Sequence, residues 1–394
     1  MTISLASGGY PPDLDGVGDY TWWLSGTLAR EGSHAVTVLT RHGPVTLQPG
    51  VHVAPTFDPA NLATVRNLPA ALEIGGLASP GSWLVFQYNP FSWGRRGWCP
   101  HVPQTLARVK RIFPSLGVAV MFHETTVPRW PLRFAAMRLW QRRFFRATCR
   151  LADVAFASTE RYQRQIITAG ARNAPIHLPV GSNLARGTLT NEAARKELGL
   201  SAGDVVVGVF GSAHMSRLLD WIAAAFRALS AKFSNVKLIY LGPDGRAICN
   251  ALGGREFLID LGVCATDKAG AYFNCMDLSL APFTDGISTR RGSAIAALQH
   301  GVPLATSVTG WTDSVFTGNV LRGLLLSRAA NARDFASDVV AWSGFLTEPE
   351  ALPALRREVV EFHDRFFAWP VIAQRLQSTL RKFSGDRRNP ASAL

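Results

Sequence analysis

The sequence predicts an α/β protein of two similar halves, each built on a parallel sheet that helices cover. Apolar runs of strand length alternate with runs of helix length, an order typical of such sheets. This alternation pauses after residue 158 and restarts at residue 204, beyond a polar connector. A chain of 394 residues is also longer than one compact core of ordinary size, which favours two domains.

The first half is expected over residues 1–183. Apolar runs bounded by turn-forming residues predict its strands at 2–7, 35–40, 83–87, 117–122 and 154–158. Between the first two strands we expect a helix at 20–30 with Asp19 as its N-cap. The loop before it contains Gly16 and Gly18, which let a backbone approach a phosphate or a sugar closely. A tight turn explains these two glycines equally well.

The second half is expected over residues 203–365, after a connector at 184–202. Its predicted strands are 204–211, 236–241, 256–260, 276–281 and 303–306. Its clearest helices are expected at 217–233 and 294–300, and a last helix at 369–383 ends the chain before a polar tail.

The stretch 281–293 has the order strand, glycine-bearing turn, helix. The turn consists of Gly286, Ile287, Ser288 and Thr289. Such a turn directs backbone N–H groups and the positive end of a helix dipole at one spot. Arg290 and Arg291 follow it, and arginine keeps its charge and matches phosphate oxygens with a rigid fork of donors. We interpret the stretch as a cradle for a diphosphate, with Asp285 left to bond sugar hydroxyls. An ordinary turn with solvated arginines is the alternative.

The net charge of +13, from 41 basic and 28 acidic residues, suggests an anionic partner. Nucleic acid, a membrane surface and a phosphorylated substrate all satisfy it. The arginines gather in one helix and one turn, and no recognised nucleic-acid motif appears, so no nucleic-acid partner is expected.

The segment 129–150 holds seven arginines and no acid. At helical spacing one face carries Trp130, Phe134, Met137, Trp140, Phe144 and Phe145. This pattern is typical of a domain helix that buries its aromatic face and leaves its basic face in solvent. A helix lying on anionic lipid is the alternative. The chain starts with a strand-like run and has no apolar run long enough to span a bilayer. We expect a cytoplasmic protein that can contact the inner face of the membrane.

Several short motifs resemble those of retaining glycosyltransferases of the GT-B fold, in the family-4 group. The matches, in chain order, are Gly16-Val-Gly18, Tyr88-Asn-Pro90, His123-Glu124, Phe210-Gly211 with Arg217, Asp285-Gly-Ile-Ser288, His300-Gly-Val-Pro303 and Trp369. The resemblance covers most of the chain. It implies two Rossmann-like domains facing each other across a cleft, with the terminal segment 366–394 packed back on the first. It also implies a nucleoside-diphosphate sugar as donor, held mainly by the second domain.

The resemblance also implies roles for individual residues. Arg217 matches a lysine that binds the donor diphosphate, and Ser212 stands where the family usually has an arginine. We infer that Arg290 and Arg291 replace that missing charge. Asp285 matches the first Glu of the family's E-x7-E pattern, which binds sugar hydroxyls, while Ser293 lies eight residues on in a region without the second Glu.

The remaining implied contacts are of three kinds. Backbone groups of Ile287 and Ser288 would face the diphosphate or the sugar, and Gly18 would contact the diphosphate. His123 matches a histidine near the transferred sugar. The catalytic residues are therefore predicted as His123, Asp285 and Arg290. The predicted donor-binding residues are Gly16, Gly18, Ser212, Arg217, Gly286, Ile287, Ser288, Thr289 and Arg291. Acceptor contacts are assigned to Tyr10, Tyr88 and Asn89.

The predicted function is retaining transfer of a sugar to a hydroxyl acceptor, in bacterial polysaccharide, glycolipid or glycoconjugate synthesis. The scheme requires no cofactor and no metal. A sugar, a glycan or a lipid-linked sugar would serve as acceptor. The alternatives are a sugar-nucleotide epimerase of the same fold and a non-enzymatic protein that binds nucleic acid or anionic membrane.

Overall fold

The structure is a computed structural model that describes residues 1–32, 34–128, 132–348 and 350–388. Contacts divide the chain into two compact units. The first unit combines Met1–Val180 with Trp369–Leu394, and the second is Gly181–Ala368. Residues 184–202, assigned to a connector from the sequence, group with the second unit.

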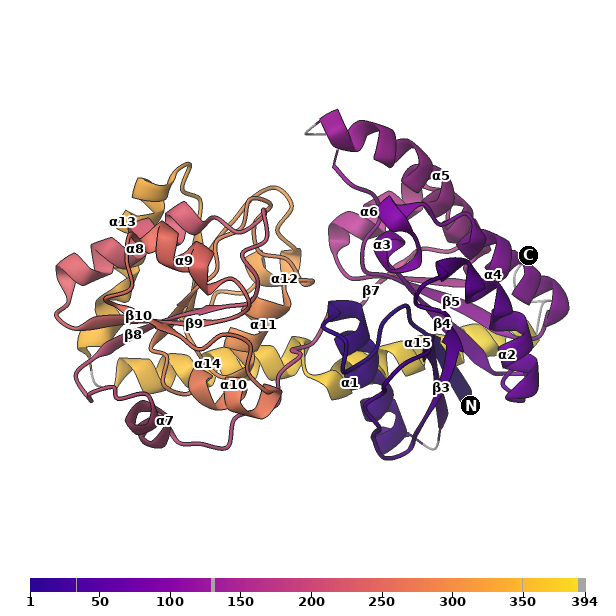
Figure 1. The fold of residues 1–394 in the computed structure, drawn as a ribbon, viewed down its shortest axis with the longest axis horizontal. Helices are drawn as coiled ribbons and strands as arrows, with labels where there is room; N and C mark the ends of the chain where they lie inside the picture. The colour runs from indigo at the N-terminus through magenta and orange to yellow at the C-terminus, as the bar shows by residue number, and fades with distance from the viewer. Residues whose placement is uncertain (33, 129–131, 349, 389–394) are drawn as a thin grey trace. The chain divides into compact units, whose positions relative to one another are not determined.

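The first unit is built on a seven-stranded sheet in which all neighbouring strands are parallel (Figure 1). In sheet order the strands are β3 (Val51–Phe57), β2 (Ala35–Arg41), β1 (Thr2–Ala6), β4 (Trp83–Tyr88), β5 (Gly117–Phe122), β6 (Val154–Ala157) and β7 (Ile176–His177). The sequence did not predict β3, since Pro55 and several polar residues interrupt its apolar pattern. An edge strand tolerates both.

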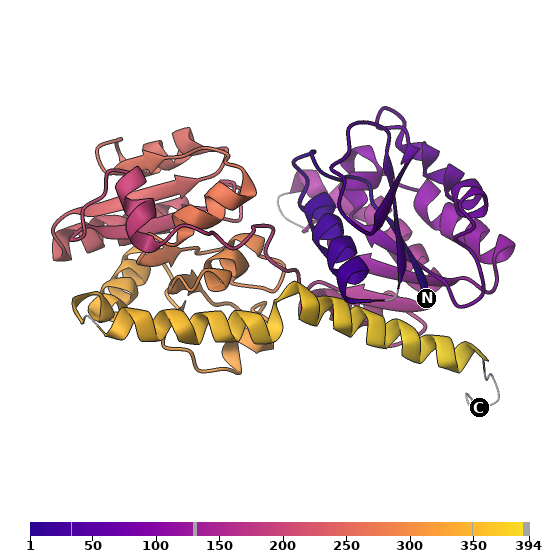
Figure 2. The ribbon, with the colours of Figure 1, turned by 90° about the horizontal axis from the view of Figure 1, so that it is seen from below.

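Helices cover both faces of this sheet. One face carries α2 (Leu68–Ile74), α4 (His101–Ile112), α5 (Ala135–Leu151) and α6 (Glu160–Thr168). The other carries α1 (Gly16–Glu31) and α15 (Trp369–Arg388), which runs along the unit in Figures 1 and 2. The short elements α3 (Pro90–Trp93), η1 (Leu62–Asn67), η2 (Arg95–Gly97) and η3 (Leu132–Phe134) lie in connecting segments. Successive residues of β4 alternate between the two apolar cores, as a strand buried on both faces must.

Helix α1 begins earlier than the sequence predicted. Its N-cap is Asp15, whose Oδ1 accepts a hydrogen bond of 3.0 Å from the Val17 amide. The expectation of Asp19 as N-cap is wrong, because Asp19 lies inside the first turn. Its carboxylate interacts favourably there with the positive end of the helix dipole. Gly16 and Gly18 therefore belong to the helix rather than to a loop.

The second unit holds a six-stranded sheet, also parallel throughout. In sheet order the strands are β10 (Leu258–Asp260), β9 (Val236–Leu241), β8 (Val205–Phe210), β11 (Leu278–Leu280), β12 (Leu304–Ser307) and β13 (Leu324–Ser327). Its helices are α7 (Asn191–Glu197), α8 (Leu219–Lys232), α9 (Gly245–Leu252), α10 (Thr266–Phe273), α11 (Gly292–Gln299), α12 (Ser314–Thr317), α13 (Ala332–Trp342) and α14 (Ala351–Phe366), with η4 (Ser343–Thr347) before the last. Helices α8 and α13 pack on one face through Phe226 and Phe335.

A buried ion pair fixes the start of the second unit. Arg195 on α7 donates to both oxygens of Asp277 over 2.9 and 2.8 Å, and both side chains are about one-tenth exposed. Asp277 also accepts from the Val206 amide at 2.8 Å. The pair therefore ties the segment before β8 to the amino end of two strands.

Among the described helices, none is long and apolar enough to cross a membrane.

Candidate functional site

A loop and a turn of the second unit meet at the carboxyl edge of its sheet. The loop, residues 211–218, connects β8 to α8, and the turn, residues 281–291, connects β11 to α11. Since β8 and β11 are neighbouring strands, the segments that follow them are adjacent. Arg217 and Phe283 pair as an antiparallel bridge through backbone hydrogen bonds of 2.8 and 3.1 Å between their neighbours. We call this surface the arginine site.

Arg217 is the most buried arginine of this site, with 7% of its surface exposed. Its Nε donates to the Ser212 carbonyl over 3.1 Å, and its Nη2 donates to the Phe210 carbonyl over 2.7 Å and to Ser293 Oγ over 3.1 Å. Burial lowers the pKa of Arg217 to about 10, which leaves it charged at neutral pH. Its Nη1 is buried without a hydrogen-bond partner among the described residues. A buried N–H of this kind is costly unless a ligand oxygen accepts from it.

Asp285 holds the other two arginines together. Its Oδ2 accepts from Arg290 over 3.2 Å, and its Oδ1 accepts from Arg291. Burial raises the pKa of the Asp285 carboxyl, but the charges and hydrogen bonds of Arg291 and Arg290 outweigh burial and hold the pKa below its ordinary value. The sequence left this carboxylate to bond sugar hydroxyls. In the structure both of its oxygens bind arginine, so its evident task is to order the two guanidinium groups, and contact with sugar stays a prediction.

Arg291 is further fixed by two groups that the sequence analysis missed. Its Nη1 donates to Ser216 Oγ over 2.9 Å, and its guanidinium carbon lies 4.3 Å from the centre of the Phe283 ring. The distance is that of a cation–π contact. Phe283 lies two residues before Asp285 in the same turn, and this position was the one feature of the sequence that could have indicated a contact with the arginines. A phenylalanine at this position could equally have packed in the core.

The turn uses its backbone amides differently from the prediction. The Ile287 amide donates to the Ser307 carbonyl over 3.0 Å, and the Thr289 amide donates to Asp313 Oδ2 over 2.7 Å. The expectation that the Ile287 amide faces a diphosphate is therefore wrong, because the Ser307 carbonyl of β12 already accepts its hydrogen bond. Gly286 has φ of +73°, and a Cβ there would lie 2.5 Å from a threonine hydroxyl, so the turn requires glycine.

Ser288 is the residue of the turn that remains suited to a ligand. It is 4% exposed, and its Oγ is buried without a hydrogen-bond partner among the described residues. Asp285 is the one acidic residue within 211–218 and 281–291, where three arginines stand. The two segments thus carry a net charge of +2, which matches a diphosphate group.

In the first unit His123 follows β5 and is buried, with 8% exposed. Its Nε2 lies 2.7 Å from Gln87 Oε1, and its ring packs edge-on against Tyr20 at 4.7 Å between centres. Burial lowers the pKa of His123 to about 3, so the imidazole is neutral near pH 7. Because the amide oxygen of Gln87 only accepts, this contact favours the tautomer with the proton on Nε2, which leaves Nδ1 as an acceptor.

The two glycines of α1 differ in their surroundings. A Cβ on Gly18 would lie 2.9 Å from backbone atoms of Gly9 and Tyr10, whereas a Cβ on Gly16 would meet nothing within 4 Å. Gly18 therefore permits the helix to pack on the preceding loop. Gly16 is exposed at the start of the helix and remains a candidate for ligand contact.

The three residues assigned to an acceptor do not behave alike. Tyr88 is fully buried against the rings of Phe122 and Phe145, so its assignment to acceptor binding is wrong: its side chain belongs to the core. Tyr10 and Asn89 line a pocket of 550 Å³ at the carboxyl edge of the sheet. The Tyr10 side chain is 2% exposed and its hydroxyl accepts from Gln48 over 2.9 Å, so it forms a wall rather than a free contact.

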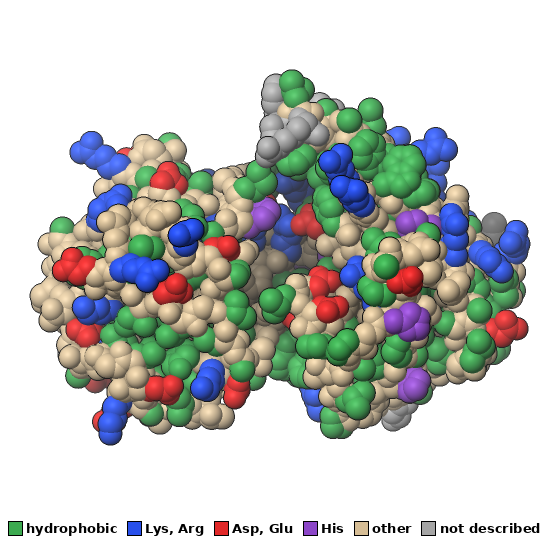
Figure 3. Space-filling view, viewed as in Figure 1, with side chains coloured by type: hydrophobic (Ala, Val, Ile, Leu, Met, Phe, Trp, Pro, Cys, Tyr) green, Lys and Arg blue, Asp and Glu red, His purple; other side chains and the backbone are tan. Residues whose placement is uncertain are grey.

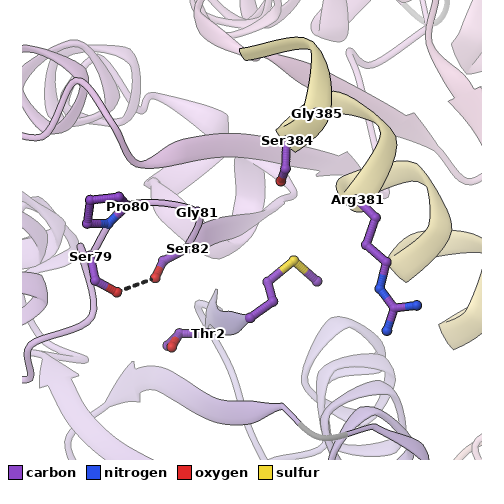
Figure 4. Close-up of a pocket in the computed structure, with 9 residues that line it drawn as sticks. Thr2, Ser79, Pro80, Gly81, Ser82, Arg381, Ser384 and Gly385 are labelled. Atoms are coloured by element: carbon purple, nitrogen blue, oxygen red, sulfur yellow. Dashed lines mark hydrogen bonds between the residues drawn. The ribbon is translucent and has the colours of Figure 1, made fainter. Parts of the chain in front are cut away.

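A second pocket of 550 Å³ lies at the amino edge of the same sheet (Figure 4). Thr2 at the start of β1, the segment Ser79–Ser82 before β4, and Ser384 of α15 line it. Figure 4 shows the hydrogen bond of 2.7 Å between Ser79 and Ser82. None of the residues predicted for catalysis or binding lines this pocket.

Helix α5 presents the two faces that the sequence predicted. Phe144 and Phe145 are buried in the core, and Phe134, Met137 and Trp140 are partly covered; Trp130 lies outside the described residues. Arg142, Arg143, Arg146 and Arg150 are exposed. Figure 3 shows basic side chains beside hydrophobic ones over this region.

The expectation of no metal overlooked one Asp-x-Asp pair, Asp13 and Asp15. Asp15 caps α1 with its Oδ1. Within the described part of the chain, no three His, Cys, Asp or Glu side chains gather as metal ligands would.

Comparison with protein families finds no matching family, and comparison with curated proteins finds no match. Solved structures do match over nearly the whole chain. A sucrose-phosphate synthase from Thermosynechococcus elongatus has a TM-score of 0.72 at 16% identity, over 97% of this chain and 98% of that one. HepE of Anabaena in complex with UDP and glucose has a TM-score of 0.67 at 15% identity, over 97% of this chain and 100% of that one. WaaG, a glycosyltransferase involved in lipopolysaccharide biosynthesis, has a TM-score of 0.65 at 14% identity, over 94% of this chain and 98% of that one. With two parallel sheets of seven and six strands and this agreement along its length, the chain has the GT-B fold.

Proposed function

We propose that the protein is a glycosyltransferase that moves a sugar from a nucleoside diphosphate to a hydroxyl acceptor. The observation that carries the proposal is the buried Arg217, whose Nη1 has no hydrogen-bond partner among the described residues. Its loop pairs with the turn that holds two further arginines against one carboxylate. Such a site binds a pyrophosphate, and GT-B structures with similar chain paths include enzymes of sugar transfer.

In the proposed reaction the acceptor hydroxyl oxygen forms a bond to the anomeric carbon as the bond from that carbon to the diphosphate oxygen breaks. The hydroxyl proton passes to an oxygen of the leaving diphosphate. Negative charge grows on that group, and fixed cations stabilise it most where water is excluded. Arg217, Arg290 and Arg291 would do this work. His123, neutral near pH 7, would position the sugar or accept a hydrogen bond from one of its hydroxyls at Nδ1.

We further propose retention of configuration. Asp285, the carboxylate of the arginine site, has both oxygens bound by arginine, which argues against its use as a covalent nucleophile. Front-face displacement therefore fits the site, in line with the resemblance to family-4 enzymes. The product configuration, measured by proton NMR of the anomeric hydrogen, tests this step; an inverted anomer refutes it.

A panel of nucleotide sugars tests the donor. HepE structures contain UDP with glucose or UDP-glucose, so UDP sugars come first, followed by GDP and ADP sugars. Binding to the folded state at a hundredfold excess over Kd stabilises it by about 2.7 kcal/mol, a clear thermal shift. The shift should persist in EDTA, and it should be lost in Arg217→Ala. Release of free nucleoside diphosphate distinguishes transfer from epimerisation, which keeps the nucleotide on the sugar. Absence of any shift together with salt-sensitive retention on DNA would favour the nucleic-acid alternative.

We also propose that α5 contacts anionic lipid, as enzymes of polysaccharide or glycolipid synthesis require when their acceptors are membrane-bound. Four exposed arginines follow Leu139 along α5, and Leu139 itself is 75% exposed. Each basic residue near an anionic surface contributes about 1 kcal/mol. Co-sedimentation with phosphatidylglycerol vesicles should fall in Arg142→Glu/Arg146→Glu. The matched control is Arg108→Glu/Arg111→Glu on α4, where both arginines are also exposed. An equal loss of vesicle binding in both variants would show that the basic protein is attracted to anionic lipid through its overall charge rather than through α5.

A further inference from the structure

An exposed histidine lies within the arginine site, on the loop that follows β8. This residue is His214, and its carbonyl accepts a hydrogen bond of 2.7 Å from the Arg217 amide, which closes a tight turn. The preceding residue is also fixed, because the Ala213 amide donates to Asp244 Oδ2 over 2.8 Å. The protein's own hydrogen bonds therefore hold His214 beside Arg217.

The hydrogen bonds of Ser216 determine which nitrogen of His214 carries the proton. A guanidinium group only donates, so Ser216 Oγ accepts from Arg291 Nη1 over 2.9 Å. The hydroxyl hydrogen of Ser216 then points to His214 Nδ1, which is 2.9 Å from the oxygen. The Ser216 amide also donates to Nδ1, over 3.3 Å. A proton on Nδ1 would face this amide hydrogen, so a neutral imidazole carries its proton on Nε2.

This arrangement makes His214 a donor toward a ligand. Among the described residues, the hydrogen bonds to this ring all end at Nδ1, and the ring is exposed. An N–H of a neutral imidazole has one direction and adds no charge, unlike the three arginines of the site. The acceptor that those arginines attract to the same place is a phosphate oxygen.

We propose that His214 is a further donor-binding residue, which gives a hydrogen bond from Nε2 to a phosphate oxygen of the diphosphate. The inference rests on the proposed function for the identity of the ligand, since a nucleotide sugar brings the diphosphate. Ser216 is then a positioning residue that links His214 to Arg291. The alternative is that His214 only orders Ser216 and touches no ligand.

Two substitutions of His214 distinguish contact with a ligand from ordering of Ser216. The oxygen of Asn replaces Nδ1 as an acceptor for Ser216 but leaves no donor at Nε2. The amide nitrogen of Gln reaches the position of Nε2 but leaves no acceptor beside Ser216. The two variants therefore lose opposite halves of the imidazole, and only one of those halves faces a phosphate in this proposal.

Calorimetry of the full chain with UDP and with inorganic pyrophosphate compares the variants. His214→Asn should bind both compounds about 10–100-fold more weakly, as expected when a hydrogen bond to a charged group is lost. His214→Gln should recover a large part of that loss. The control is His52→Asn, which changes an exposed histidine on β3 and should bind both compounds as the wild type does.

Side-chain NMR of the protein with ¹⁵N-labelled histidine reads the tautomer directly. In mildly alkaline buffer, where histidine is ordinarily neutral, the His214 proton should be on Nε2. Adding pyrophosphate should shift the signal of that proton and leave it on the same nitrogen. A proton on Nδ1, or an Nε2 signal that pyrophosphate does not move, contradicts the assignment.

The results also separate this contact from the proposed function. If His214→Asn binds UDP as tightly as the wild type, or if Asn retains affinity and Gln does not, the contact is overturned and sugar transfer stands. If UDP and pyrophosphate binding depends on His214 but no nucleotide sugar releases its nucleoside diphosphate, transfer is refuted and the contact stands. A wild-type protein that binds neither compound overturns both.

Discussion

Arg217 Nη2 donates a hydrogen bond of 3.1 Å to Oγ of Ser293, the second residue of α11. Ser293 lies eight residues after Asp285, at the position where the resemblance implies a second Glu, so Arg217 contacts a hydroxyl there instead of a carboxylate. A hydroxyl there leaves the guanidinium charge uncompensated, so the arginine site is more cationic than a site with a glutamate would be. Three variants test what that charge does.

Replacing Arg217 should remove phosphate binding without unfolding the protein. Loss of one preorganised transition-state donor costs about 10²–10³-fold in turnover. Arg217→Ala should lose at least that in nucleoside diphosphate release, and Arg217→Lys should recover only part, since lysine lacks the fork. Arg227→Ala on the exposed side of α8 is the control. Near-normal turnover in Arg217→Ala would remove the foundation of the proposed function.

Replacing Asp285 separates ordering of the arginines from contact with sugar. Asp285→Asn keeps the shape but removes the charge that orients Arg290 and Arg291. We expect turnover to fall about 10–100-fold while the Kd for UDP, measured by calorimetry, stays the same or tightens, because the site loses a negative charge. Weaker UDP binding together with slower turnover would contradict the ordering role.

His123 should make the protein less stable in mild acid. Its pKa is about 6.5 when unfolded and about 3 when folded, so the unfolded state binds the proton first as pH falls below 6.5. Stability is thus fully present above that pH and is lost between the two values. From pH 7 to about 5.5 this one group removes about 1 kcal/mol, or about 2–4 °C in Tm. His123→Gln should show a smaller decrease in Tm over the same interval. An unchanged decrease would place the acid sensitivity in other buried histidines, such as His363.

The two glycines at the start of α1 form a matched pair. Gly18→Ala should lower Tm by several degrees, because the new Cβ would meet backbone atoms at 2.9 Å. Gly16→Ala has open space and should leave Tm equal or slightly higher, since alanine favours a helix by about 1 kcal/mol. If Gly16→Ala nevertheless slows turnover, Gly16 contacts a ligand. Equal Tm values for both variants would show that the packing argument fails.

The ion pair of Arg195 and Asp277 should matter for stability alone. Arg195→Met leaves a buried carboxylate without its partner, which costs about 3–5 kcal/mol in the second unit. The double variant Arg195→Met/Asp277→Leu should recover a large part of this loss, since it removes the unpaired charge as well. Calorimetry of the full chain checks both. A single variant with unchanged Tm would show that the pair does not hold α7 in place.

The sequence predicted regular elements better than it predicted contacts. Central strands such as β5 and β9 were found from their apolar runs, because burial on both faces leaves no other pattern. The edge strand β3 was missed because Pro55 and exposed residues hide it. The start of α1 was misplaced because Asp15 and Asp19 are both acceptable caps in sequence, and only the path of the preceding loop selects Asp15.

For the site, composition revealed the arginines but not their partners. That Arg291 packs on Phe283 and that Asp285 binds two arginines depend on side-chain directions set by the pairing of two distant segments. The Ile287 amide was assigned to a ligand because the sequence could not show that β12 supplies an acceptor. Tyr88 was assigned to an acceptor for a similar reason, since a tyrosine after a strand can point to either side of the sheet.

Helix α15 joins the sheet of the first unit only after the whole second unit has been synthesised. Trp369, Ile372, Leu376 and Leu380 complete an apolar core with side chains from β1, β2 and β4. On the ribosome, therefore, the first unit carries an uncovered apolar strip until the last residues emerge, and any early stop of translation leaves that strip open. Such fragments should be bound by chaperones or degraded, and this unit would be completed last although its synthesis starts first.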